Sequence, residues 1–199
     1  QAAALPLAGL TAYRALFVQG GLRAGETVLI TGVGGGVSSL ALQLAVAAGA
    51  KVWVTSSSQH KIDRAVQLGA RGGFDYTNDS WPKQMLEHSA APTLIIDSAG
   101  GAGYGALLNL AAPGGRIVNY GATKGPPDKL DLYKLFWKQL KLIGSTMGSP
   151  DDFAALLRLA VKHRIQPVID GVFPLHDADA VIARMASSPQ FGKLVLACE

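Results

Sequence analysis

Four glycines fall within five residues, Gly32 to Gly36, in the run Val28-Leu-Ile-Thr-Gly-Val-Gly-Gly-Gly-Val-Ser-Ser-Leu-Ala-Leu-Gln-Leu-Ala45. A short apolar strand precedes this turn and an apolar helix follows it. Glycines let the backbone approach a phosphate closely, and the first amides of the helix point at its negative charge. The spacing departs from G-x-G-x-x-G, because Val37 holds the last position, and fits G-x-x-G-G-V-S from Gly32. The arrangement predicts a dinucleotide phosphate site, and a turn that binds nothing is the alternative.

Composition limits the class of protein. The chain has 199 residues, of which 49% are hydrophobic and 16% charged, with a formal net charge of +4, so we expect a packed α/β domain or slightly more. Lys and Arg are scattered rather than clustered among aromatics, which argues against nucleic-acid binding. Cys198 is the only cysteine and the four histidines are spread out, so no metal site is expected. We see no membrane span and no secretory signal, and expect a soluble protein of a reducing compartment, the cytoplasm.

Strand and helix patterns alternate along most of the chain. Strands are expected at 27–31, 51–55, 93–97, 116–120 and 140–145, and helices at 7–18, 37–48, 58–69, 79–88, 102–112, 132–139 and 151–163. This alternation predicts a Rossmann domain over 1–165, a doubly wound parallel sheet with helices on both faces. Two short strands around a helix follow, at 168–175, 177–187 and 192–197, and suggest that the tail 166–199 belongs to another sheet.

The residues after the second strand bear on the choice of cofactor. Ligands of this fold lie at the carboxyl ends of the strands, where NAD binders usually carry Asp or Glu to accept from the ribose hydroxyls. Here the hydroxyls of Thr55 to Ser58 and then Lys61 follow the strand, and the first carboxylate is Asp63. Donors and a positive charge favour the 2′-phosphate of NADP(H). A serine-rich helix cap with a solvated lysine is the alternative.

The sequence lacks the catalytic motifs that would identify a hydrolase or a short-chain dehydrogenase. Gly-x-Ser-x-Gly is absent, and no Tyr-x-x-x-Lys stands at a suitable place. Asp97, at the end of a buried strand, is interpreted as a capping residue, and Ser38 and Ser39, at a helix start, as caps or phosphate donors rather than as nucleophiles. The catalytic residues therefore stay unknown from the sequence. The missing ribose acid also argues against S-adenosylmethionine and a methyltransferase.

Several segments together resemble the medium-chain dehydrogenases/reductases, within which quinone-oxidoreductase-like and zinc-type alcohol-dehydrogenase-like members are most similar. Besides the glycine turn these segments are Leu5–Leu16, Ala48–Val52, Leu68–Ala70, Ala112–Arg116, Tyr120–Ala122, Phe136–Gln139 and Gly144–Gly148. The resemblance implies a GroES-like catalytic domain ahead of the Rossmann domain. The chain would then be a cofactor-binding fragment, and its tail would return to that absent domain.

The resemblance also implies which residues hold the cofactor. Gly35, Gly36 and Val37 would face the pyrophosphate. Thr55, Ser56, Ser57 and Lys61 would face the phosphate on the adenosine ribose, with Tyr76 near the adenosine end. Thr11, Ser98, Ala99, Tyr120, Gly121, Ala122 and Ser145 would line the path to the nicotinamide.

One departure from the family concerns zinc. Zinc-dependent members carry a cysteine ligand four residues before the counterpart of Thr11, and Leu7 stands there in this chain. We therefore expect zinc-independent hydride transfer between NADP(H) and a small-molecule quinone, enone or carbonyl substrate. The alternatives are a zinc-dependent alcohol dehydrogenase and a non-catalytic NADP(H)-binding sensor. The family habit of pairing Rossmann sheet edges makes 140–145 a candidate homodimer contact, although a monomer can also leave such an edge open.

Overall fold

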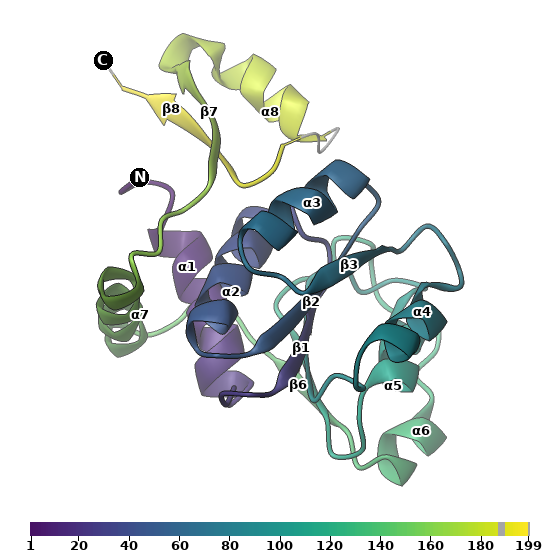
Figure 1. Ribbon diagram of the computed structural model, residues 1–199. Coiled ribbons are helices and arrows are strands. Elements are labelled where there is room, and N and C mark those ends of the chain that lie inside the picture. Colours follow the sequence, from purple (N-terminus) through teal and green to yellow (C-terminus); the bar gives the residue numbers. More distant parts are fainter. Residues whose placement is uncertain (187–189, 199) are drawn as a thin grey trace.

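A six-stranded parallel sheet forms the centre of the protein in the computed structural model, which describes residues 1–186 and 190–198 (Figure 1). The strands are β1 (Thr27–Ile30), β2 (Lys51–Ser56), β3 (Gly72–Asp75), β4 (Leu94–Asp97), β5 (Arg116–Asn119) and β6 (Lys141–Gly144). Their order is β3-β2-β1-β4-β5-β6, and every neighbouring pair is parallel. The order reverses between β1 and β4, as in a Rossmann fold. The predicted doubly wound fold is therefore confirmed.

Helices cover both faces of this sheet. One face carries α1 (Pro6–Tyr13), the π-helix η1 (Arg14–Gln19), α2 (Gly36–Ala47), α3 (Gln59–Gln67) and α7 (Pro150–His163). The other face carries α4 (Trp81–His88), α5 (Tyr104–Leu110) and α6 (Leu132–Trp137). None of the helices in the described part of the chain is long and apolar enough to cross a membrane.

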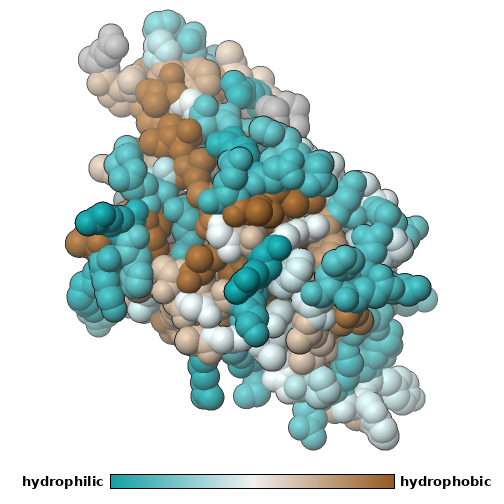
Figure 2. Space-filling view, viewed as in Figure 1, coloured by the Kyte–Doolittle hydropathy of each residue, from teal (hydrophilic) through white to brown (hydrophobic). Residues whose placement is uncertain are grey.

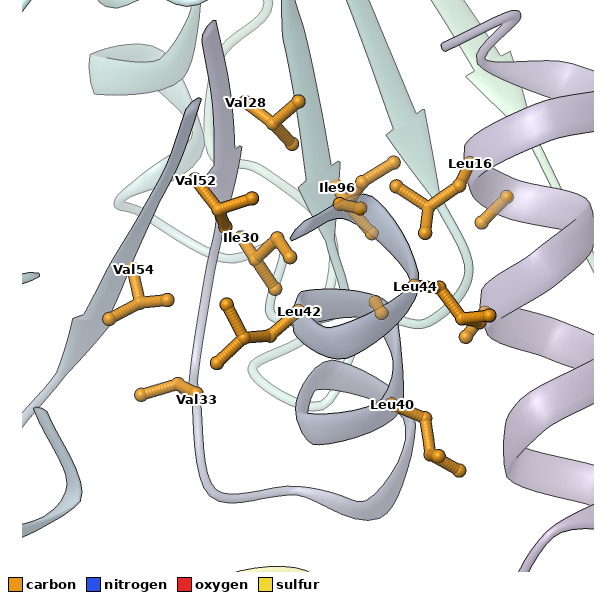
Figure 3. Packing of buried hydrophobic residues seen from close by; sticks show 14 of the residues in the cluster. Leu16, Val28, Ile30, Val33, Leu40, Leu42, Leu44, Val52, Val54 and Ile96 are labelled. Atoms are coloured by element: carbon orange, nitrogen blue, oxygen red, sulfur yellow. The ribbon is translucent and has the colours of Figure 1, made fainter. Parts of the chain in front are cut away.

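The alternation of side chains along each strand divides the core into two layers. Val28 and Ile30 of β1 point to the face covered by α2, whereas Leu29 between them points to the opposite face. Figure 3 shows the first layer, in which Leu42 of α2 packs against the sheet residues. The first layer positions the glycine turn, because α2 starts directly after it.

Strand β3 was not expected from the sequence. Gly72 and Gly73 give it low strand propensity. The structure explains both glycines by close packing, since a Cβ on Gly72 would lie 2.8 Å from the Trp53 ring and a Cβ on Gly73 would lie 2.7 Å from Ile62 of α3. Glycine is therefore required at these two positions of β3, which forms by pairing with β2 despite its low strand propensity.

Two predicted helices are present but differ in local detail. The helix predicted for 7–18 changes from α to π geometry at Arg14, and the π segment ends at Gln19 before Gly20 and Gly21. The helix predicted from Asp79 begins at Trp81, and Asn78 accepts hydrogen bonds from both the amide and the hydroxyl of Ser80. In contrast, α7 begins as its Ser149-Pro150 start predicts, with a capping box between Ser149 and Asp152.

The tail forms its own small sheet. Its elements are β7 (Ile169–Pro174), the 3-10 turn η2 (Leu175–Asp177), α8 (Ala178–Ala186) and β8 (Lys193–Ala197), and β7 pairs with β8 in parallel. The expected two strands around a helix are therefore present, although residue 187 of the predicted helix lies outside the described residues. Figure 1 shows these elements at one end of the molecule beyond α3, and Figure 2 shows hydrophobic surface over the two strands. That the tail serves a second domain stays a prediction.

Candidate functional site

The glycine turn between β1 and α2 is held in shape by buried hydroxyls. Gly32 and Gly34 have φ angles of +63° and +120°, which side chains other than glycine rarely adopt. The amide of Gly32 donates to Thr55 Oγ1 over 3.2 Å. From the other side, the hydroxyl of Ser38 lies 3.0 Å from the carbonyl oxygens of Gly32 and Gly35. Contacts within the chain therefore hold the shape of the turn.

The start of α2 fits a diphosphate. Gly35 is the N-cap residue, is exposed, and has an ordinary φ of −71°, so no backbone strain demands glycine there. The missing side chain instead leaves the space above the helix start open. The first amides of a helix have no partner within it and carry the positive end of its dipole. Gly35, Gly36 and Val37, the predicted pyrophosphate residues, lie together at this point.

Two lysines flank the turn. A Cβ on Gly34 would lie 2.8 Å from Cδ of Lys61, and a Cβ on Gly36 would lie 2.5 Å from Cδ of Lys193. Both stems therefore cross glycine backbone that a larger residue would block. Lys61 was predicted, whereas Lys193 was missed because it follows the turn by more than 150 residues and belongs to the tail. In the sequence, only the glycine directly before Lys193 hints that the chain passes close to other backbone there.

The hydroxyls after β2 divide into two roles. Thr55 and Ser56 are buried, and their oxygens accept from the amides of Gly32 and Ser58 over 3.2 Å each. Ser57 is exposed and stays open to a ligand. Ser58 occupies the N-cap of α3, but its side chain makes no capping hydrogen bond, which weakens the alternative of a simple serine cap. Of the four hydroxyls, those of the exposed Ser57 and the half-buried Ser58 are placed to meet a bound group.

Tyr76 lies where three loops meet. Its amide donates to the carbonyl of Ser56 over 3.2 Å, and Nζ of Lys124 lies 4.4 Å from the centre of its ring. The loop that carries Lys124 is fixed to the loop after β4, because the Lys124 amide donates to the carbonyl of Ala99 over 2.8 Å. The structure thereby brings the predicted residues Tyr76, Ser98 and Ala99 to one edge of the sheet.

A cleft of about 510 Å³ opens at the carboxyl ends of β5 and β6. It is lined by Arg14, Gln19, Asn119, Tyr120, Gly121, Gly144, Ser145 and Thr146. The hydroxyl of Ser145 is buried and has no hydrogen-bond partner among the described residues, so it is available to a polar ligand group. Thr11 does not line this cleft. Its hydroxyl donates to the carbonyl of Leu7 over 2.9 Å and lies 4.0 Å from Sδ of Met147.

A buried carboxylate network lies beneath these loops. Asp97 is 1% exposed and accepts hydrogen bonds from the hydroxyl of Thr31 (2.6 Å), the amide of Gly100 (2.9 Å) and Nδ2 of Asn119 (2.9 Å). Oδ1 of Asn119 in turn accepts from the hydroxyl of Tyr104 over 2.6 Å. These contacts use both oxygens of Asp97 to join β1, β4, β5 and α5. They agree with the interpretation of Asp97 as a structural rather than a catalytic residue.

Two tyrosines beside this network are kept neutral. Burial, helped by the charge of Asp97, raises the pKa of Tyr104 to about 12. Burial also raises the pKa of Tyr120 to about 12, against the opposing effect of its hydrogen bond with the Ser98 side chain. Both phenols therefore stay protonated at neutral pH and can donate but do not act as bases.

We expect Tyr104 to make the stability of the fold depend on pH in the alkaline range. A folded pKa above the unfolded value near 10 means that its contribution is complete below about pH 10 and is lost as pH rises toward 12. Urea unfolding at several pH values should therefore show a smaller alkaline loss of unfolding free energy in Tyr104→Phe than in the native chain. Tyr133→Phe, which removes an exposed phenol, is the control. Equal alkaline losses in both variants would contradict the assignment.

No group of three or more His, Cys, Asp or Glu residues in the part of the chain that the structure describes is arranged to hold a metal ion. Leu7, at the position where zinc-dependent relatives are expected to carry cysteine, is 59% exposed on α1.

Known proteins are similar to this chain in both sequence and fold. The sequence model of the family described as zinc-binding dehydrogenase matches residues 36–162. A zinc-type alcohol dehydrogenase-like protein, YogA of Leptosphaeria maculans, is 37% identical over 98% of this chain and 58% of its own length. A quinone oxidoreductase of Pseudomonas aeruginosa is 32% identical over 98% of this chain and 64% of its own length. The chain thus spans little more than half the length of these relatives.

Solved structures give the same result. An NAD-dependent alcohol dehydrogenase superposes with a TM-score of 0.94 at 34% identity, covering 100% of this chain and 59% of the other. A 2-octenoyl-CoA carboxylase reductase in complex with NADP and 2-octenoyl-CoA superposes with a TM-score of 0.91 at 25% identity, covering 100% of this chain and 49% of the other. The chain therefore belongs to the zinc-binding dehydrogenase family of medium-chain dehydrogenases/reductases and carries the nicotinamide-nucleotide-binding fold of that family.

Proposed function

We propose that this chain binds NADP(H) for an oxidoreductase that transfers hydride, without zinc, between the nicotinamide and a quinone, enone or other carbonyl substrate. The observation that carries the proposal is the chemistry at the end of β2. An exposed hydroxyl, Ser57, and a lysine, Lys61, stand where an NAD-specific site usually has a carboxylate.

The 2′-phosphate of NADP(H) suits this corner of the site. A phosphate carries close to two negative charges and needs hydrogen-bond donors, and a carboxylate beside it would repel it. Ser57 offers a hydroxyl, and Lys61 offers an ammonium group on a stem that crosses Gly34. The fold does not decide between the cofactors, because an NAD-dependent alcohol dehydrogenase and a reductase in complex with NADP both superpose on the whole of this chain, so the proposal rests on these side chains.

The diphosphate would lie between the start of α2 and Lys193. The exposed backbone at Gly35 lets the phosphates approach, and Lys193, whose stem lies against Gly36, would compensate their charge from the tail side. The bound cofactor supplies the hydride chemistry, and this chain binds and orients it.

The nicotinamide end offers space and a few polar groups. The small residues Gly121 and Ala122 follow β5 and leave room for a ligand beside it. The buried Ser145 hydroxyl can bind a polar group of the nicotinamide. Leu7 supports chemistry without a catalytic zinc, since a leucine side chain cannot bind a metal. Under this proposal hydride goes to an acceptor activated by its own conjugated carbonyl, as the name of the quinone oxidoreductase relative also suggests.

Calorimetric titration of NADPH and NADH, side by side, tests the cofactor preference. The native chain should prefer NADPH. Lys61→Ala should weaken NADPH binding about 10- to 150-fold, which corresponds to roughly 1.5–3 kcal/mol for a hydrogen bond to a charged group. NADH, which lacks the 2′-phosphate, should change little. Lys83→Ala, which removes an exposed lysine of α4, is the matched control. Equal losses for both nucleotides, or a native preference for NADH, would contradict the assignment.

Gly35→Val tests the pyrophosphate site separately from the fold. Because φ of Gly35 is −71°, valine can adopt the backbone, although its Cβ would lie 3.3 Å from Oγ of Ser38, and its side chain would extend over the start of α2. We expect the binding of both nucleotides to be lost and the melting temperature to fall by far less than unfolding of the turn would require, because only the Ser38 hydroxyl has to give way. Gly105→Val, where a Cβ meets nothing within 4 Å, controls for the added volume. Retained binding in Gly35→Val would mean that the turn is purely structural.

Activity of the full-length protein separates the remaining alternatives. Stoichiometric NADPH binding without turnover of quinones, enones or aldehydes would favour the non-catalytic sensor. Turnover that a chelator abolishes and zinc restores would favour the zinc-dependent alcohol dehydrogenase.

We also propose a homodimer through the β6 edge of the sheet. β6 has a strand neighbour on one side only, and the adjacent α6 exposes Tyr133, Phe136 and Trp137, the last of them 83% exposed. Trp137→Glu should shift sedimentation velocity from dimer to monomer, whereas Leu86→Glu on α4 should not. A native chain that sediments as a monomer at all accessible concentrations would refute this contact.

A further inference from the structure

Among the described residues of the tail, the segment Phe191 to Lys193 contacts the glycine turn. The amide of Gly192 donates to the carbonyl of Gly34 over 2.8 Å, and the amide of Lys193 donates to the carbonyl of Val168 over 2.9 Å. The position of the Lys193 side chain against Gly36 therefore depends on a segment outside the six-stranded sheet.

Asp170 of β7 holds this segment. Its side chain is 13% exposed, and Oδ1 accepts from the amide of Phe191 over 3.1 Å. Oδ2 accepts from Nη2 of Arg184 in α8 over 2.9 Å, and Nη1 of Arg64 in α3 lies 3.5 Å from Oδ1. One carboxylate thus connects the tail strand, the tail helix, a helix of the Rossmann domain and the segment that carries Lys193.

The segment itself has little freedom. Phe191 is buried in the first core layer, and the guanidinium of Arg64 lies 4.5 Å from the centre of its ring. Gly192 has a φ of +107°, and a Cβ there would overlap the carbonyl oxygen of Val168. The direction in which the chain leaves Phe191 is therefore fixed, and Lys193 follows from it.

We infer that Asp170 is the positioning residue that holds Lys193 over the diphosphate site and so sets cofactor affinity from outside the nucleotide-binding sheet. The inference rests on the proposed function. A lysine stem has several rotatable bonds, so an ammonium group ordered before the ligand arrives binds phosphate more tightly than one that must be ordered on binding. Asp170 contributes this order through backbone contacts, without touching the ligand.

A double-mutant cycle on the whole chain tests the inference, with NADPH affinity measured by calorimetry. Lys193→Met should weaken NADPH binding by about tenfold or more through loss of a charged contact. Asp170→Ala should weaken binding by about 3- to 10-fold in the native background and hardly at all in the Lys193→Met background, because the two residues act through one contact. Asp151→Ala, on the exposed start of α7, is the control and should leave affinity unchanged.

The outcomes separate this inference from the proposed function. A native chain that binds neither NADPH nor NADH would overturn both. A native chain that binds NADPH, with Asp170→Ala causing the same loss in both backgrounds, would overturn the positioning role alone, since a general loosening of the fold weakens binding regardless of Lys193. If Asp170→Ala melts too low for titration, Arg184→Gln, which removes one partner of the carboxylate, takes its place in the same cycle and is judged by the same criterion.

Discussion

The carboxylate of Asp97 fixes the edge of the sheet on which the whole candidate site is built. A charge buried to this degree is costly unless hydrogen-bond donors satisfy it. Here the donors are the hydroxyl of Thr31, the backbone amide of Gly100 and the side-chain amide of Asn119. These donors come from the ends of β1 and β5 and from the loop that leads to α5, and Asp97 itself ends β4, which lies between those two strands. Because they share one acceptor, the strand ends cannot shift independently. The loops that would line a cofactor therefore leave the sheet from fixed points.

Side chains also hold the backbone at the glycine turn. Thr55 of β2 accepts from Gly32, and Ser38 of α2 reaches back to the carbonyls of the turn. The turn thus takes its shape from the strand beside it and the helix after it. A preformed turn suits a site that must present amides to a phosphate, since little order remains to be gained on binding.

Features of the fold and the site that arise from a continuous stretch of sequence could be predicted, whereas those that depend on contacts between distant residues could not. The apolar strands β1 and β4 and the turn with its helix are each a continuous pattern, and the fold follows from them. β3 was missed because Gly72 and Gly73 serve the close approach of Trp53 and Ile62, which are distant in sequence. Thr55 was expected beside the cofactor, but its hydroxyl is used by Gly32, a contact that no spacing rule reveals. Lys193 was missed for the same reason, since its place follows from how the tail docks.

The choice between the two nicotinamide cofactors lies in the side chains at the end of β2 rather than in the fold. An NAD-dependent alcohol dehydrogenase and a reductase solved with NADP both superpose on this chain, with TM-scores of 0.94 and 0.91. A backbone that accommodates both leaves the distinction to what meets the adenosine ribose. There a carboxylate would accept from free hydroxyls, whereas an exposed serine and a lysine instead favour an added phosphate. Since the hydroxyls of Thr55 and Ser56 are buried and accept from backbone amides, selectivity for NADP(H) would rest on Lys61 and on the hydroxyls of Ser57 and Ser58. The stem of Lys61 lies across Gly34, so the residue proposed to bind the ribose phosphate also borders the turn proposed to bind the diphosphate.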